Sequence, residues 1–257
     1  MVPDEKHLVM VGKKLTCDDK AFDKVFPPCS ERNVDKTVGR VVRSDGALGT
    51  GTIIESDGIN ATGVTAKHVL FKGKNKKPLF GHFFQCSIRT RPKKANFLAK
   101  ITIDEVLINP TSDKDIALFK GKYTKPKPLL SGVITPVAEQ SRKRKHILIH
   151  HHPLGIEDQR RNKGELDQAS NETHYVSTLP GSSGAPVMTK SGDALIGIHT
   201  GSGAQIKKVR YTGGALKHLH NKEFSLSDCN EYVSIQKDEL NGFNKSFKMA
   251  RTKGKKK

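Results

Sequence analysis

Short stretches that alternate apolar and polar residues, separated by turn residues, run along most of this chain. A period of two places one face of a strand in the core, and helical periodicity is scarce. The first stretches, at 39–43, 49–55 and 62–69, are separated by Ser-Asp-Gly turns and are expected to form successive antiparallel strands. The pattern therefore predicts an all-β protein.

Further strands are predicted in two groups, on either side of a Lys- and Pro-rich stretch at 123–130. The first group continues at 83–89, 97–103 and 116–120, and the second comprises 132–137, 146–150, 174–178, 186–189 and 194–199. A chain of 257 residues suits one large all-β unit or two small lobes. We expect two antiparallel β-barrels, at 34–122 and 123–230, with a functional cleft between them. An N-terminal extension at 1–33 and a tail at 231–257 flank the barrels.

The sequence TLPGSSGAPV at 178–187 has the composition of a nucleophile loop. A serine that attacks a carbonyl group needs an oxyanion hole, which main-chain N–H groups supply best where side chains are small. The N–H groups of Gly181 and Ser183 are the candidate donors. Gly184 allows a sharp turn behind the serine, and Pro186 stiffens the exit into the next strand. Ser183 is therefore the candidate nucleophile.

A serine hydroxyl becomes a good nucleophile only when a base removes its proton and a carboxylate orients that base. The candidate base is His68, which follows small residues and precedes an apolar run in GVTAKHVLF. The candidate acid is Asp115, which stands just before the apolar run IALF in DKDIALFK. Asp113 and Asp104 are the alternative acids.

These three blocks, in the order His68, Asp115 and Ser183, resemble those of chymotrypsin-like serine proteases. TAKHV is similar to that family's TAAHV block, with Lys67 as the departure, and DIAL is similar to its acid block. The order differs from those of the subtilisins and the α/β-hydrolases. The resemblance covers about residues 35–225 and implies a two-barrel serine endopeptidase with no cofactor.

The loop pattern looks most like the proteases of positive-strand RNA viruses, namely the sobemovirus and astrovirus serine enzymes and the picornavirus main proteases. The resemblance implies that Thr178 and His199, the latter in IGIHTG, line the pocket for the substrate residue before the cut. A neutral imidazole and a hydroxyl can donate to Gln or Glu, so cleavage after Gln or Glu is expected. Ser177 stands where trypsin-type enzymes carry an acid, which disfavours cleavage after Lys or Arg. Tyr175 is a candidate to orient His199, although the family's orienting tyrosine aligns with His174.

Four other features bear on the site. Backbone around Thr200 and Gly201 is expected to pair with an extended substrate. Ser182 replaces the aspartate that precedes the nucleophile in trypsin, so no zymogen switch of that kind is implied. The segment HHPLG at 151–155 resembles a turn of bacterial glutamyl endopeptidases. Consecutive strand residues point to opposite faces, so the three histidines at 150–152 are not expected to bind metal.

The formal net charge of +19 widens the set of candidate partners. About +14 of it falls on residues 34–230, with clusters at 74–77, 89–94, 142–145 and 160–163. The tail from 245 to 257 holds seven basic residues and no acidic one. Such a field attracts polyanions, so RNA is a candidate partner through the basic surface and the tail. Binding would be directed at the RNA backbone, because aromatic residues are few.

The cellular compartment is predicted from the lack of signal-peptide and membrane-spanning patterns in the sequence. The N-terminus has no apolar signal core and no run of eighteen apolar residues occurs, so a cytoplasmic location without a membrane segment is expected, in the host cell if the protein is viral. The four cysteines are then expected to be free thiols.

The leading hypothesis is a serine endopeptidase that processes a viral polyprotein. Two alternatives are kept: a cellular protease of the glutamyl endopeptidase or HtrA type, and an RNA-binding protein that keeps the fold with weak or no activity. Reaction of Ser183 with a fluorophosphonate separates the enzyme from the binding protein.

Overall fold

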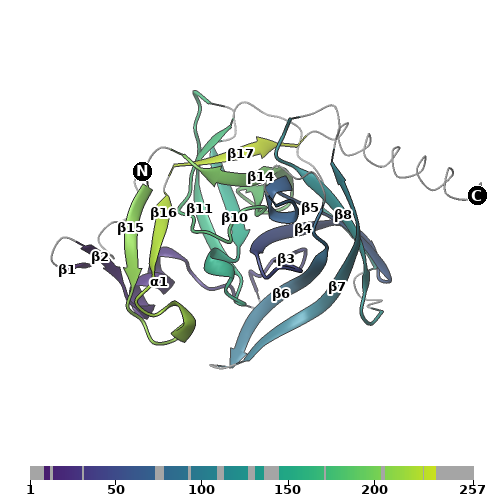
Figure 1. Cartoon of the computed structure of the whole chain (residues 1–257). Coiled ribbons are helices and arrows are strands. Elements are labelled where there is room, and N and C mark those ends of the chain that lie inside the picture. Colours follow the sequence, from purple (N-terminus) through teal and green to yellow (C-terminus); the bar gives the residue numbers. More distant parts are fainter. Residues whose placement is uncertain are drawn as a thin grey trace, which may run out of the picture.

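The computed structural model describes residues 9–11, 14–30, 32–72, 78–91, 94–108, 113–126, 131–135, 145–170, 172–203, 206–227 and 229–235. Basic clusters at 74–77 and 142–144, and the tail beyond 235, lie outside these residues. Two β-barrels stand side by side, and a smaller sheet lies on the far side of the second barrel (Figure 1).

The first barrel is formed by antiparallel strands in the order β3-β6-β7-β8-β5-β4, and pairing of β3 with β4 closes it. A seventh strand, β9, adds to the outer edge of β4. The bounds are β3 (Val38–Arg43), β4 (Leu48–Asp57), β5 (Asn60–Thr65), β6 (Gly81–Arg91), β7 (Lys94–Ile108), β8 (Ala117–Tyr123) and β9 (Ser131–Ile134). Apolar side chains that alternate along these strands fill the interior, including the fully buried Ile53, Phe83 and Phe119.

The second barrel is closed in the order β10-β11-β12-β17-β14-β13, again with antiparallel neighbours. Its strands are β10 (His146–His151), β11 (Arg160–Leu166), β12 (Thr173–Tyr175), β13 (Pro186–Thr189), β14 (Leu195–Ser202) and β17 (Asn230–Ser234). The all-β prediction with two antiparallel barrels is therefore confirmed.

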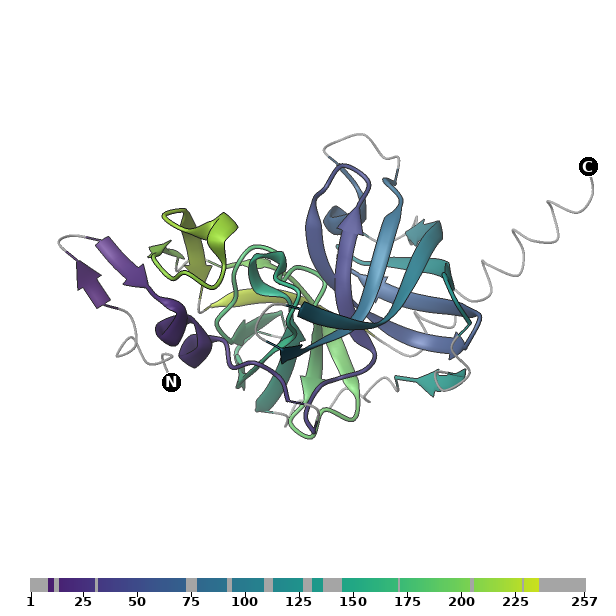
Figure 2. The same cartoon turned by 90° about the horizontal axis from the view of Figure 1, so that it is seen from below.

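The third sheet has the order β1-β2-β15-β16 and pairs the N-terminal strands with a hairpin from the later part of the chain. Its strands are β1 (Val9–Val11), β2 (Lys14–Cys17), β15 (Ile206–Tyr211) and β16 (Glu223–Ser227), and β2 runs parallel to β15. Helix α1 (Asp19–Val25) follows β2, and the Asp18 carboxylate caps it by accepting from the N–H of Ala21 at 2.7 Å. Figure 2 shows this lobe beside the second barrel, away from the first.

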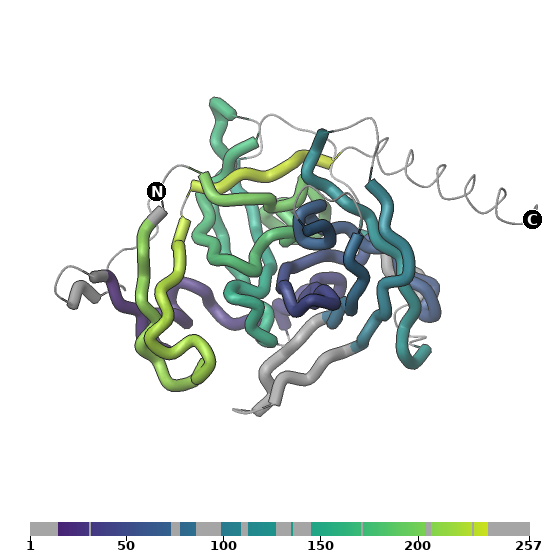
Figure 3. Tube along the Cα trace, viewed as in Figure 1, coloured from purple at the N-terminus to yellow at the C-terminus, as the bar shows by residue number. Residues whose placement is uncertain are grey.

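The chain leaves α1 along the second barrel and then enters β3 of the first barrel, as Figure 3 traces in purple. Main-chain hydrogen bonds of about 3.0 Å tie Arg161 to Pro27 and Cys29 to Gln159 along this path. The region predicted as a bare N-terminal extension therefore carries regular elements packed on the second barrel.

Several element predictions differ from the structure. The predicted strand at 62–69 ends at Thr65, and residues 67–70 instead form a short helix, α2 (Lys67–Leu70). The strand predicted at 132–137 as part of the second barrel is β9, which pairs with β4 of the first. Strands β11, β15, β16 and β17 and the 3₁₀ turns η3 (Pro153–Gly155) and η4 (Lys217–Leu219) were not predicted. The sequence RRNKGEL of β11 has no apolar alternation, and the other elements are only three to six residues long, which is too short for a clear periodicity.

Two smaller observations concern the described residues. Cys17, Cys29 and Cys229 carry free thiols, as expected. No helix among them has the length and apolar character needed to cross a lipid bilayer.

Candidate active site

The side chains of His68 and Asp115 meet at the edge of the first barrel. His68 lies in α2 and Asp115 lies just before β8. The Asp115 carboxylate accepts from the main-chain N–H of His68 at 2.9 Å, and its second oxygen lies 2.5 Å from His68 Nδ1. Burial alone would raise the pKa of Asp115, but the hydrogen bonds and charge of His68 outweigh it and hold that pKa below its usual range. Asp115, rather than Asp113 or Asp104, is therefore the acid that contacts His68.

Arg43 fixes the helix that carries His68. Its buried guanidinium group donates to the carbonyls of His68, Val69 and Phe71 at 3.3–3.5 Å, and these are carbonyls that a short helix leaves unpaired at its end. Asp45 holds the guanidinium from the other side at 2.7 and 3.0 Å. Nothing in the sequence around Arg43 signalled this role, because the two segments are 25 residues apart.

The loop that carries Ser183 crosses from the second barrel to the first. The carbonyl of Ser183 accepts from the N–H of Thr50 in β4 at 2.8 Å. Gly184 has a φ of +87°, and a Cβ there would lie 3.0 Å from the nitrogen of Ala66, the residue just before α2. Ser183 is therefore next to the helix of His68. Within the described residues the Ser183 hydroxyl has no hydrogen-bonded partner. In enzymes without substrate, the hydrogen bond between a nucleophile and its base is often long and tightens only when substrate binds.

Two main-chain N–H groups in this loop are free to bind an oxyanion. The N–H groups of Ser182 and Gly184 are donated to Leu179 and His199, whereas those of Gly181 and Ser183 have no main-chain acceptor among the described residues. Gly181 has a φ of +94°, which only glycine adopts readily. Its carbonyl accepts from the Thr50 hydroxyl at 2.8 Å, which fixes the turn. These two N–H groups are the candidate donors named from the sequence.

Thr178 is buried, and its hydroxyl donates to Asn230 Oδ1 at 2.8 Å. Asn230 Nδ2 in turn donates to the carbonyls of Val176 at 2.6 Å and Ser227 at 3.1 Å. Because both amide protons face carbonyl groups, the orientation of the Asn230 amide is fixed, and with it the direction of the Thr178 hydroxyl proton. Asn230 is 52 residues from Thr178 in the chain, so the sequence did not reveal the pair.

His199 lies in β14 with its ring buried against His174, and Nδ1 of His199 is 3.2 Å from Nε2 of His174. Burial, with a smaller contribution from His151, lowers the pKa of His199 to about 3, although a hydrogen bond to the main chain of Glu231 opposes the shift. The proposed orienting role of Tyr175 is wrong, because that side chain is exposed on the other face of β12. His174, its strand neighbour, faces inward and contacts His199.

The tautomers of this histidine pair follow from burial. Nδ1 of His174 is buried with no partner among the described residues, and burial lowers the pKa of His174 well below its usual value. A buried N–H without an acceptor costs more than a lone pair without a donor. We therefore assign the proton of His174 to Nε2, which donates to His199 Nδ1. Nε2 of His199 then carries its proton.

The other residues singled out in the sequence lie in β14, at the end of β10 and in the turn after β10. Thr200 and Gly201 lie in β14, where a bulge separates His199 from Gly201 in the pairing with β17. The three histidines at 150–152 have separate partners: Gln159 for His150, Ser182 and Asn162 for His151, and the Ile156 carbonyl for His152.

Two antiparallel barrels, with the histidine and aspartate at the edge of one and the serine loop on the other, define the chymotrypsin-like fold. Among solved structures, the chain is similar to a Glu endopeptidase at 12% identity and a TM-score of 0.59, over 93% of this chain and 100% of that chain. A human pathogenic astrovirus serine protease aligns at 17% identity and a TM-score of 0.44, over 79% of this chain and 91% of that chain. No family model matches the sequence, and no curated protein matches it.

Proposed function

We propose that the protein is a serine endopeptidase in which Ser183 is the nucleophile and His68 the general base. The observation that carries the proposal is the His68–Asp115 pair next to the loop of Ser183, in which the N–H groups of Gly181 and Ser183 have no acceptor in the part of the chain that the structure describes. The chymotrypsin-like fold supports the same assignment. The structural likeness by itself concerns the fold, so the chemistry rests on these residues.

The geometry supports acyl transfer in two halves. The Asp115 carboxylate accepts a hydrogen bond from Nδ1–H of His68, which leaves Nε2 free to take the proton of Ser183 as its oxygen attacks the scissile carbonyl. The N–H groups of Gly181 and Ser183 then stabilise the oxyanion, and His68 returns the proton to the leaving amine. Water, activated by His68 in the same way, releases the acyl group from Ser183.

We also propose that the enzyme prefers Gln over Glu before the cut. The single proton of the Thr178 hydroxyl is donated to Asn230, so toward the pocket Thr178 can only accept. The amide of Gln supplies a donor for Thr178 and an acceptor for Nε2–H of His199. This acceptor competes with the Glu231 main chain for the His199 proton. A Glu carboxylate supplies two acceptors, and His199 is neutral at pH 7. We expect kcat/KM for Gln to exceed that for Glu by about 10- to 100-fold, the cost of one mispaired buried group.

The substrate would bind as an extended strand beside Thr200 and Gly201. A viral polyprotein is the substrate proposed from the motif resemblance, with processing in the host cytoplasm. RNA binding is retained as an accessory property because the net charge is +19.

The test is labelling by a fluorophosphonate, which reacts only with an activated serine. Wild type and a Ser191→Ala control, in which an exposed turn hydroxyl is removed, are expected to label, and Ser183→Ala is not. A peptide library incubated with the same proteins then reports the residue before the cut. Absence of labelling and of cleavage, together with salt-sensitive binding to RNA, would favour the RNA-binding alternative. Preference for Lys or Phe before the cut would overturn the pocket assignment to Thr178 and His199.

A further inference from the structure

A buried chain of hydrogen bonds ends on Ser182, the residue just before the proposed nucleophile. The ring of His151 in β10 is completely buried, with Nδ1 2.8 Å from the Ser182 hydroxyl and Nε2 3.0 Å from Oδ1 of Asn162 in β11. Nδ2 of Asn162 donates to the carbonyl of Val25, the last residue of α1, at 2.7 Å. Side chains from two strands thus connect the N-terminal helix with the loop of Ser183.

The direction of each hydrogen bond is set from the Val25 end. Because Asn162 donates to a carbonyl through Nδ2, its Oδ1 is the atom that faces His151, and it must accept. Nε2 of His151 therefore carries the proton. The ring is neutral, since burial lowers its pKa to about 4, so Nδ1 has only a lone pair to offer. The Ser182 hydroxyl donates to that lone pair.

Ser182 then braces the turn that contains Gly181. Its oxygen accepts from the N–H of Leu179 at 3.4 Å, and its own N–H donates to the Leu179 carbonyl at 3.0 Å. The Gly181 N–H lies inside this turn and the Ser183 N–H immediately follows it. A displacement of Ser182 would move both donors of the proposed oxyanion hole.

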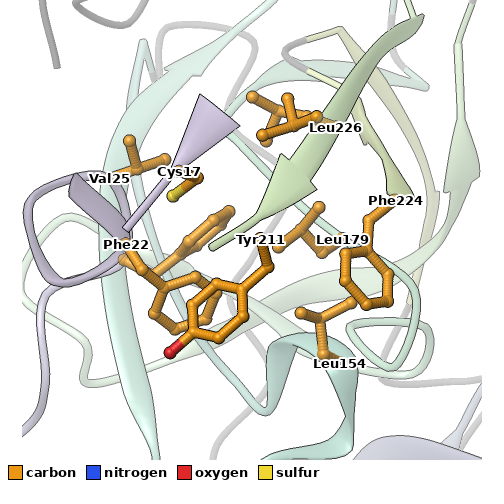
Figure 4. A pocket seen from close by; sticks show the side chains of 10 residues that line it. Cys17, Phe22, Val25, Leu154, Leu179, Tyr211, Phe224 and Leu226 are labelled. Carbon is orange, nitrogen blue, oxygen red and sulfur yellow. The ribbon is translucent and has the colours of Figure 1, made fainter. Parts of the chain in front are cut away.

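Apolar packing presses the N-terminal segment 18–29 against the same loop. Phe22 and Phe26 of this segment belong to one cluster with Leu154, in the turn after β10, and Leu179, in the nucleophile loop. Figure 4 shows Leu154 and Leu179 facing a small apolar cavity together with Phe22, Val25 and Cys17. The Phe26 ring also lies 5.8 Å from the His151 ring, between centroids.

Arg160 holds segment 18–29 in place through its charged side chain. The buried guanidinium group of Arg160 donates to the Asp23 carboxylate at 2.5 Å and to the Phe26 carbonyl at 2.8 Å. It also lies 5.2 Å from the centroid of the Phe22 ring. These contacts fix the position of segment 18–29 against the second barrel, next to the nucleophile loop.

We propose that His151 is a positioning residue for the oxyanion hole, and that segment 18–29 acts through Asn162 and His151 to set Ser182. The proposal rests on the proposed peptidase function. Burying an imidazole, an amide and a hydroxyl together is unfavourable unless each is paired, and a fully paired network holds one geometry. Catalysis needs that accuracy, because a misplacement of 1 Å can cost about 100-fold in rate.

Two variants of His151 each remove one of its two hydrogen bonds, either the one to Asn162 or the one to Ser182. In His151→Asn the short amide can still accept from Ser182 but no longer reaches Asn162. In His151→Gln the longer amide can donate to Asn162 but offers no acceptor to Ser182. We expect His151→Gln and Ser182→Ala to lower kcat by about 100-fold with little change in KM, and His151→Asn to retain more activity. Combining His151→Gln with Ser182→Ala should add almost nothing, because both remove the same contact.

Asn162→Leu tests the contribution of the N-terminal segment. It removes the acceptor that fixes the His151 tautomer, so we expect a fall in kcat of about 10-fold, without loss of the folded state. Ile147→Val, a buried change in the same strand, is the control for general destabilisation of β10 and should leave kcat unchanged. Thermal unfolding of every variant gives the folded fraction at the assay temperature.

The outcomes are distinguishable. If Ser182→Ala and His151→Gln are folded and keep the wild-type kcat, the inference is wrong although the peptidase proposal stands. If kcat falls only as far as the folded fraction does, or falls equally in Ile147→Val, the network is structural and the inference is likewise overturned. If His151→Gln does not fold, Ser182→Ala alone decides. Wild type that neither labels nor cleaves overturns the proposed function itself.

Discussion

Asp115 holds His68 at two points: one carboxylate oxygen accepts the main-chain N–H of His68 at 2.9 Å, and the other lies 2.5 Å from Nδ1. The first contact places the start of α2 and the second sets the ring within it. A carboxylate can only accept, so Nδ1 of His68 carries the proton and Nε2 is free to act as a base.

Asp115→Asn should therefore remove activity while leaving the fold intact. The amide nitrogen would donate to Nδ1 and stabilise the tautomer with a protonated Nε2, which cannot take a proton from Ser183. We expect kcat to fall by about 10³- to 10⁴-fold. Asp113→Asn, an exposed change two residues earlier, is the control and should behave as wild type. Steady-state cleavage of a peptide substrate measures both, and an Asp115→Asn variant within tenfold of wild type would contradict the triad.

Arg43→Met should loosen α2 and lower both stability and activity. The change removes the donor to three carbonyls at the end of the helix and the two-point contact with Asp45, which keeps only the weaker contacts with Lys72 and the Ala47 N–H. We expect a loss of roughly 2–3 kcal/mol in the free energy of unfolding, typical for hydrogen bonds to a buried charged group, and slower fluorophosphonate labelling of Ser183.

Arg210→Met is the matched control for that change. Arg210 pairs with Glu223 at 3.0 Å on the surface of the third sheet, with both side chains about two-fifths exposed. Such a pair contributes less than about 1 kcal/mol. Urea unfolding compares the two variants, and equal losses would show that Arg43 has no special role at the helix.

The parts of the candidate site that a sequence can predict are those defined by residues close together in the chain. Each block of the proposed triad combines a reactive side chain with neighbours that fix its surroundings, such as Gly181 and Gly184 near Ser183. The structure places His68, Asp115 and the Ser183 loop at one edge between the barrels, and finds positive φ angles at Gly181 and Gly184. The two-barrel fold was likewise predictable from strand alternation and turn residues.

The sequence could not reveal contacts made across the barrels. Arg43, Asn230 and His151 each act on a residue 25 or more positions away, and no local pattern marks a polar side chain that will be buried with a partner. Tyr175 was chosen over His174 because the strand register was unknown, and a shift of one residue turns a side chain to the opposite face. Helix α1 was missed because seven residues give too short a window for helical periodicity.

Thr178→Val should change which residue is preferred before the cut. Valine keeps the shape of threonine and removes the oxygen that would accept from a Gln amide. We expect kcat/KM for Gln substrates to fall by about 10- to 100-fold and that for Glu substrates to fall less, so the ratio between them moves toward one. Thr173→Val is the control, because the hydroxyl that it removes from β12 donates to Ser170 and not to Asn230. Paired peptides that differ only in Gln or Glu measure the ratio, and an unchanged ratio would remove Thr178 from the pocket.

Stability should fall steeply as the solution is acidified from neutral pH. Burial is the main cause that lowers the pKa of His151 to about 4 and the pKa values of His152 and His199 to about 3. An unfolded chain protonates histidine near pH 6.5. Below that pH the unfolded state binds more protons than the folded one, so stability is complete above pH 6.5 and is lost as the pH falls toward 4. His151 alone would account for roughly 3 kcal/mol at pH 4, at about 1.4 kcal/mol for each pKa unit.

Because a domain of this kind has only about 5–15 kcal/mol in total, we expect the protein to unfold between pH 4 and 5. Urea unfolding at pH 7.5, 6.0 and 5.0 measures the slope. His199→Gln removes one deeply buried titrating group and should flatten this slope. A free energy of unfolding that stays constant from pH 7.5 to 5.0 would show that these rings are not held neutral by burial. The proton positions assigned to His151, His174 and His199 would then fail with them.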